Sequence, residues 1–195
     1  EDERFYRHHG IDFQGLFAAI KDIASGHARG ASTITQQLAK NLFRVRTEYS
    51  TGLLGKIPGV KILVMKAKEW IVAVKLEMIF SKEDILTMYF NTVDFGSNSF
   101  GIKTACRTYF NTTPDKLTYE QAATLVGLLK ATSSYNPRLN PKNSTKRRNV
   151  VLTNLYDHGH LVINGKKAQK YQLDSIKAIP MQVSSKGIES SYDGI

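Results

Sequence analysis

Apolar residues recur at helical spacing along most of the chain, and no stretch clearly predicts a strand. Phe13, Leu16, Phe17 and Ile20 share one helical face and predict a helix over residues 11–25. Similar patterns, with Ser-x-x-Asp and Thr-x-x-Gln starts at residues 81 and 118, predict further helices. One of the predicted helices begins after residue 33. The others cover residues 66–80, 81–91, 102–110, 118–129 and 143–158. The pattern indicates an all-α fold.

The helix after residue 33 has the most informative polar positions. Ser32 or Thr33 can serve as its N-cap, and Gly30 allows close approach of backbone or ligand. Ile34, Leu38 and Leu42 form a face that can be buried. The other face carries a polar stripe of Thr33, Gln36, Gln37, Lys40 and Arg44. Such a stripe suits either a solvated helix face or a phosphate cradle, since a helix N-terminus and a lysine both favour anions.

Residues 50–65 are rich in apolar side chains, but three glycines and Pro58 predict that no regular element forms there. Lysines interrupt the apolar run. We therefore expect either a loop packed on the core or a mobile segment that dips into a lipid interface.

Composition narrows the choice of partner. The 195 residues carry a formal net charge of +10, which predicts an anionic partner such as a phosphorylated substrate, a membrane surface or nucleic acid. Cys106 is the one cysteine, so no intrachain disulfide can form, and its apolar surroundings indicate a packing role. No apolar run is long enough to span a membrane.

The first ten residues place three carboxylates beside Phe5, Tyr6 and two histidines. A carboxylate near a less polar wall suits acid–base chemistry on a sugar. The alternative is a frayed acidic start. His8 by itself indicates a structural histidine more than a catalyst.

Two of these stretches carry a resemblance to a known family. Glu1, Asp2, Phe5, His8 and Gly10, followed by residues 30–41, resemble the first two motifs of the peptidoglycan glycosyltransferases. This is the family-51 glycosyltransferase domain of class A penicillin-binding proteins and of monofunctional transglycosylases.

Three further motifs of that family follow in order. Lys66 and Glu69 match the third motif, although Met65 stands where the family has arginine. Residues 82–91, which end in Asn91, match the fourth, and residues 147–152, with Arg148, match the fifth. A lysine at the position of Lys130 contacts phosphate in the family.

The resemblance implies a lysozyme-like helical domain of two lobes over residues 1–175, with a small membrane-facing lobe at about residues 42–65. Residues 176–195 would begin a linker to a missing C-terminal region, because the chain is expected to be a piece of a longer protein.

The implied activity is polymerisation of lipid II into β-1,4 glycan strands, by inverting transfer from an undecaprenyl-pyrophosphate donor. Glu1 would act as base, and Glu69 would orient a cation or hold a divalent ion. The implied substrate-binding residues are Gly30, Ser32, Thr33, Gln36, Gln37, Lys40, Arg44, Arg46, Lys66, Asn91, Lys130 and Arg148.

No cofactor is expected to be required, although Mg or Mn could lie at the pyrophosphate. The expected partners are lipid II, the growing glycan, the membrane and a C-terminal transpeptidase domain, but no nucleic acid. The expected location is the extracytoplasmic face of the bacterial cell membrane, with an N-terminal transmembrane anchor in the parent chain.

Two alternatives remain at this stage. A lysozyme-like hydrolase or lytic transglycosylase would use the carboxylates on finished glycan, with little need for phosphate-binding lysines. A basic nucleic-acid-binding helical protein would explain the charge alone, and it would leave Glu1 and the polar stripe without a role.

Overall fold

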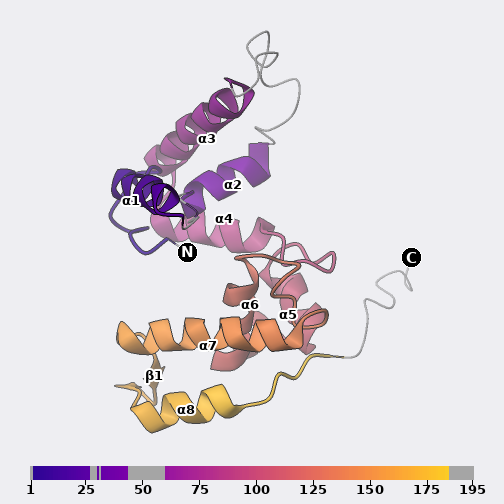
Figure 1. The fold of residues 1–195 in the computed structure, drawn as a ribbon. Coiled ribbons are helices and arrows are strands. Elements are labelled where there is room, and N and C mark those ends of the chain that lie inside the picture. Colours follow the sequence, from indigo (N-terminus) through magenta and orange to yellow (C-terminus); the bar gives the residue numbers. More distant parts are fainter. Residues whose placement is uncertain (1, 27–29, 31, 44–59, 185–195) are drawn as a thin grey trace, which may run out of the picture. The chain divides into compact units, whose positions relative to one another are not determined.

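A computed structural model describes residues 2–26, 30, 32–43 and 60–184 (Figure 1). The chain divides into two compact units, Glu1–Val93 and Asp94–Ile195. The described residues are predominantly helical, with a single two-stranded sheet, so the prediction of a helical fold class is confirmed. Among the described helices, none combines the length and the apolar character needed to cross a membrane.

The described residues of the first unit form four helices, and α2 packs against both α3 and α4. Residues 2–12 form turns before α1. The helices are α1 (Phe13–Ala24), α2 (Ile34–Phe43), α3 (Val60–Ile79) and α4 (Lys82–Thr92). The core contains Phe5, Leu38, Ala39, Ala73, Leu76, Ile85 and Tyr89.

Helix α3 begins earlier than the sequence predicts. Residues 60–65 were expected to lack regular structure, yet they form its first turns. This part of the expectation is wrong because the helix breakers Gly52, Gly55, Pro58 and Gly59 all precede Val60, and nothing after it opposes a helix. The rest of the predicted small lobe, residues 44–59, lies outside the described residues.

Gly10 positions the N-terminal loop against α3. Its φ is +83°, and a Cβ added there would lie 2.8 Å from the backbone of Ala73 and Val74. Only glycine tolerates both this conformation and this approach. The loop is thereby held close to the start of α2.

In the second unit, residues 94–184 form four more α-helices, a short 3₁₀ helix and a hairpin. Helix α6 packs against α7, and α8 packs against both. The elements are α5 (Ile102–Phe110), η3 (Pro114–Lys116), α6 (Tyr119–Leu128), α7 (Pro141–Asp157), β1 (Val162–Ile163), β2 (Lys166–Lys167) and α8 (Lys170–Ala178). Their shared core is built on Ala123, Leu152, Leu161, Ala168 and Leu173.

The hairpin and α8 were not predicted. Strands β1 and β2 are antiparallel, and Asn164 and Gly165 between them have φ values of +51° and +74°. Asn-Gly is a strong signal for a two-residue hairpin, so this element could have been found. Helix α8 continues to Ala178, beyond the predicted domain end at residue 175.

The chain after α8 remains bonded to the second unit. The N–H of Ser184 donates to the carbonyl of Tyr109 at 2.7 Å, and the Arg138 side chain donates to the Ser184 carbonyl at 3.2 Å. Residues 179–184, called the strap below, therefore cross this unit as a held segment.

Candidate active site

Thr33 is the N-cap of α2. Its Oγ1 accepts the backbone N–H of Gln36 at 3.1 Å, which satisfies one of the unpaired donors of the first turn. The predicted cap is therefore confirmed.

Two members of the polar stripe on α2 do not fit the alternative of a solvated helix face. Thr33 and Gln36 are each only 2% exposed. Thr33 Oγ1 donates to the carbonyl of Gly10 at 2.8 Å, and Gln36 Nε2 donates to the same carbonyl at 3.0 Å. Both side chains thus bond α2 to the N-terminal loop, a contact that helical spacing alone could not reveal.

The remaining members of the stripe diverge. Gln37 Oε1 accepts a hydrogen bond from the hydroxyl of Tyr89 at 3.2 Å, so its side chain faces α4. Lys40 is exposed, and so is Asn91 on the last turn of α4. Gly30 is also exposed, and a Cβ there would meet no described atom within 4 Å.

The ammonium of Lys66 contacts residues of both the second and the third motif. Its Nζ lies 3.0 Å from Glu69 Oε2, 3.0 Å from Gln36 Oε1 and 2.8 Å from Ser32 Oγ. The carboxylate of Glu69 is only 2% exposed, whereas the Lys66 side chain is 27% exposed. The predicted pair therefore forms with its carboxylate buried, unlike a surface ion pair of little energetic value.

This arrangement orients the Ser32 hydroxyl. An ammonium has three N–H donors, and the three acceptors around Lys66 use all of them. Because Ser32 Oγ accepts from Lys66, its own O–H can donate elsewhere, and Ser32 is exposed. The Lys66 ammonium is held in place by the buried carboxylate of Glu69. A hydroxyl beside such a fixed cation is suited to bind an oxyanion at this end of α2.

Asp2 and His8 of the first motif have structural positions. Asp2 Oδ2 accepts the N–H of Ile34 at 2.9 Å, at the start of α2, and its two oxygens lie 3.0 and 3.1 Å from His8 Nε2. His8 is buried, as a structural histidine would be. Asp2 thus fixes residue 2 against the N-terminus of α2.

Glu77 and Lys82 complete a buried charged cluster that the sequence did not reveal. Glu77 Oε1 accepts from the hydroxyl of Thr35, and its Oε2 lies 2.6 Å from Lys82 Nζ. Lys82 Nζ also donates to the His8 carbonyl at 2.7 Å and lies 4.3 Å above the Phe5 ring. Lys82 belongs to the fourth motif, which was the available signal, but its partner Glu77 lies outside all five motifs.

Three predicted residues, Glu1, Arg44 and Arg46, lie outside the described residues. The predicted alternative of a divalent ion at Glu69 does not fit the groups present there. Its carboxylate already pairs with an ammonium, which would repel a cation, and the described part of the chain holds no cluster of three or more His, Cys, Asp or Glu able to bind a metal.

The structure corrects the predicted role of Arg148, which lies in the second unit. It was predicted to bind substrate, but it is 1% exposed, and burial lowers the pKa of its guanidinium. Its Nη1 donates to the carbonyl of Ile179 at 2.8 Å, its Nη2 to that of Lys177 at 2.8 Å, and its Nε to Asn149 at 3.0 Å. It therefore caps the C-terminal end of α8 and holds the strap.

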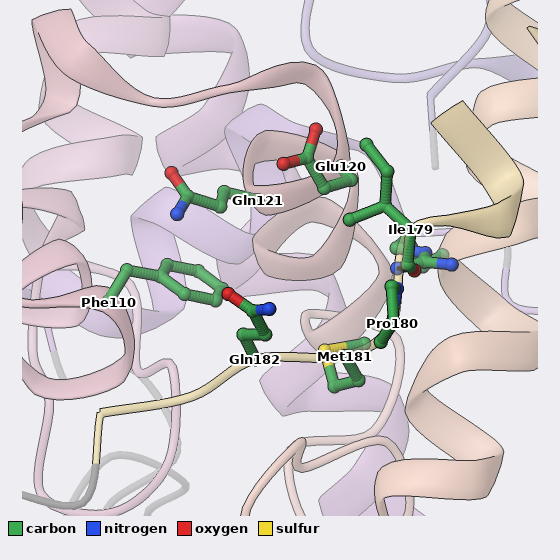
Figure 2. Close-up of a pocket in the computed structure, with 8 residues that line it drawn as sticks. Phe110, Glu120, Gln121, Ile179, Pro180, Met181 and Gln182 are labelled. Carbon is green, nitrogen blue, oxygen red and sulfur yellow. Dashed lines mark hydrogen bonds between the residues drawn. The ribbon is translucent and has the colours of Figure 1, made fainter. Parts of the chain in front are cut away.

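A small cavity of about 40 Å³ lies beside Arg148, between α6 and the strap (Figure 2). Glu120 and Gln121 of α6 face Ile179, Pro180 and Met181 across it. The cavity is of the size of a few waters, so it marks the packing of the strap rather than a substrate site.

Lys130 follows α6 and is exposed at an open pocket of the second unit.

Cys106 is fully buried, and this burial raises the pKa of its thiol to about 11. The thiol is therefore neutral near pH 7, in agreement with the predicted packing role.

Comparisons with known proteins agree with these motifs. Residues 1–156 match the family model described as Transglycosylase. Penicillin-binding protein 1A of Escherichia coli (strain K12) is 40% identical over 163 residues, which cover 83% of this chain and 18% of that protein. Penicillin-binding protein 1F of Bacillus subtilis (strain 168) is also 40% identical over 163 residues, covering 83% and 21%.

A crystal structure of Penicillin-Binding Protein 1A from Haemophilus influenzae is 34% identical, with a TM-score of 0.47 over 53% of this chain and 14% of that one. The present chain spans about a fifth of the length of the curated relatives it matches.

Proposed function

The chain belongs to the transglycosylase family, and we propose that it polymerises lipid II into β-1,4-linked glycan strands. The observation that carries the proposal is the Lys66 cluster. It brings the exposed Ser32 and the buried Gln36 of the second motif together with Glu69 of the third, and it leaves the Ser32 hydroxyl able to donate to an oxyanion. A pyrophosphate leaving group is such an oxyanion.

In the proposed reaction, Glu1 removes the proton from the 4-hydroxyl of the acceptor sugar. The hydroxyl oxygen attacks the anomeric carbon of the donor as the bond to the lipid pyrophosphate breaks. An α-linked donor then gives a β-1,4 product, and the pyrophosphate leaves with the bonding electrons. Asp2 supports this role, because its bonds to Ile34 and His8 hold the residue next to Glu1 against α2.

The developing charge on the pyrophosphate requires positive groups and hydrogen-bond donors. The exposed Lys40, together with Arg44 and Arg46, is proposed to supply the charge. Ser32 is proposed to donate a hydrogen bond, oriented by the Lys66–Glu69 pair. No step is assigned to a metal ion, because the groups at Glu69 fit an ammonium.

The proposed substrate has a lipid tail, which places the domain at a membrane surface. Apolar side chains exposed on the first unit support this placement, notably Phe17 at 71%, Ile62 at 68% and Leu63 at 75%. We further propose that the parent chain is anchored in the bacterial cell membrane with this domain on the extracytoplasmic face. A transpeptidase domain would follow, as the much greater length of the relatives allows.

The test is incubation of the protein with labelled lipid II, with the products resolved by size. The expected result is a ladder of glycan chains, and the matched control Glu1→Gln is expected to give none. Unchanged lipid II, or release of fragments from finished glycan, would reject the proposal. The second outcome would favour the hydrolase alternative.

A further inference from the structure

Glu77 is a buried carboxylate on α3 that the proposed reaction leaves unused, and it lies outside all five motifs. Its side chain is 2% exposed, and it meets groups from three other parts of the first unit. Oε1 accepts from the hydroxyl of Thr35 in the first turn of α2, and Oε2 lies 2.6 Å from the ammonium of Lys82 at the start of α4. The third group is the imidazole of His8 in the N-terminal loop, with Nδ1 3.9 Å from Oε1. One carboxylate thus faces α2, α4 and the N-terminal loop together.

Lys82 extends this contact to the backbone of the N-terminal loop. Its Nζ donates to the carbonyl of His8 at 2.7 Å and lies 4.3 Å from the centre of the Phe5 ring. The Glu77 carboxylate holds the ammonium at both contacts, because a charge in this partly buried place needs an ionic partner. Phe5 and His8 belong to the first motif. Glu77 therefore acts on the first motif through Lys82.

The network closes on the first turn of α2. The Nε2 atom of His8 lies 3.0 and 3.1 Å from the two oxygens of Asp2, and Asp2 Oδ2 accepts the N–H of Ile34 at 2.9 Å. Glu77 accepts from the next residue of the helix, Thr35. The N-terminal loop is therefore fixed to the start of α2 by two routes, and both depend on the groups around Glu77.

We propose that Glu77 is a positioning residue for the proposed reaction, because it fixes the N-terminal loop and so directs the base Glu1 toward the acceptor hydroxyl. The inference rests on the proposed function and deepens it. Asp2 directly follows Glu1 in the chain, so the reach of the base depends on where residue 2 is held. A general base works at about 2.6–3.2 Å from the group that it deprotonates, and a displacement of about 1 Å can cost about a hundredfold in rate.

A paired substitution separates positioning from stability. Glu77→Met with Lys82→Met replaces the buried ion pair by two apolar side chains, a change that is often neutral or stabilising. The double variant should regain most of the denaturant midpoint that Lys82→Met alone loses. It still lacks the bonds to Thr35 and to the carbonyl of His8. We therefore expect kcat to stay about tenfold to a hundredfold below wild type, with KM changed by less than about twofold.

Hydrogen exchange gives a readout that needs no substrate. Because Asp2 accepts the N–H of Ile34, a displaced loop should speed the exchange of this amide by about tenfold or more in the double variant. The N–H of Val93, which donates to the carbonyl of Tyr89 at the end of α4, should exchange as in the wild type. Unchanged exchange at Ile34 would overturn the inference.

The matched control is Lys170→Met with Asp174→Met, which removes an exposed ion pair on α8. It should change neither kcat nor the exchange at Ile34. If the Glu77 double variant does not fold, Glu77→Gln takes its place, since the amide keeps the shape of the side chain but has one acceptor oxygen in place of two. A lower kcat at unchanged KM is again the expected result.

The two measurements distinguish this inference from the proposed function. If the double variant regains both its stability and the kcat of the wild type, the network serves folding alone and the inference is overturned. If the wild type forms no glycan chains from lipid II while the exchange at Ile34 responds as expected, the proposed function fails and the hold on the loop is supported.

Discussion

Lys82 pairs with Glu77 across the turn between α3 and α4, with Nζ 2.6 Å from Oε2 and the Glu77 side chain only 2% exposed. The same ammonium binds the carbonyl of His8 and lies over Phe5. One lysine therefore connects two helices to the N-terminal loop that carries the first motif. Lys82 of the fourth motif thus helps to hold the loop that carries the first motif.

This pair predicts a large loss of stability for Lys82→Met. The substitution leaves the buried Glu77 carboxylate without its ammonium, which typically costs about 3–5 kcal/mol. The measurement is the free energy of unfolding in denaturant. Lys170→Met is the control, because its pair with Asp174 on α8 is 64% and 56% exposed and should contribute less than about 1 kcal/mol. Similar losses in both variants would mean that the Glu77 pair has no special role.

Arg148 leads to a prediction about the strap. Arg148→Ala should free residues 179–184, since three charge-assisted hydrogen bonds are lost and the carbonyls of Lys177 and Ile179 lose their partner. A hydrogen bond to a charged group contributes about 1.5–3 kcal/mol. Faster cleavage after α8 in limited proteolysis and faster hydrogen exchange at Ser184 are the expected signs.

Lys142→Ala, an exposed change in the first turn of α7, serves as the control for the strap. If Arg148→Ala leaves proteolysis unchanged and only raises KM for lipid II, the original assignment to substrate binding regains support.

The sequence predicted the local features of this fold well. The capping box of Ser81 and Asp84 starts α4. At the start of α6, the side-chain oxygen of Gln121 accepts the backbone N–H of Thr118. These signals lie within four residues, so the sequence displays them directly. The Asn164–Gly165 turn was equally local and was overlooked.

The burial of particular polar groups could not be predicted in the same way. Gln36 is buried because the loop at Gly10 crosses α2, and Arg148 is buried because the strap returns to α7. Both depend on chain segments more than 20 residues away. An amphipathic pattern reports a polar side chain, but it does not distinguish solvent from a buried carbonyl as its partner.

The Lys66 cluster gives a prediction that separates stability from activity. Lys66→Met should destabilise the protein by about 3–5 kcal/mol, because it removes one partner of an ion pair whose Glu69 carboxylate is buried. Adding Glu69→Gln should restore much of that stability without restoring polymerisation, since Ser32 would remain without its orienting ammonium. Ser32→Ala should keep full stability and lower kcat/KM by about tenfold or more. Recovery of activity in the double variant would remove the cluster from the mechanism.

Arg4 and Asp12 provide a test by pH. Arg4 donates to both Asp12 oxygens, the shortest contact being 2.7 Å, and these hydrogen bonds lower the pKa of the Asp12 carboxyl; the N–H of Gly15 adds to the effect. A carboxyl with a lowered folded-state pKa binds fewer protons folded than unfolded near that pKa. Its stabilising contribution is therefore complete above the unfolded value of about 3.9 and is lost as the pH falls through the folded value.

Asp12→Asn removes this titration while keeping the shape of the side chain. The difference in unfolding free energy between wild type and Asp12→Asn should be constant from pH 5 to 7 and should shrink steadily below about pH 4. Denaturant unfolding at a series of pH values measures it, at low and at high salt. A difference that stays constant down to pH 2 would show that the pKa of Asp12 is the same in the folded and unfolded chain, and that the Arg4 pair does not stabilise the N-terminal loop.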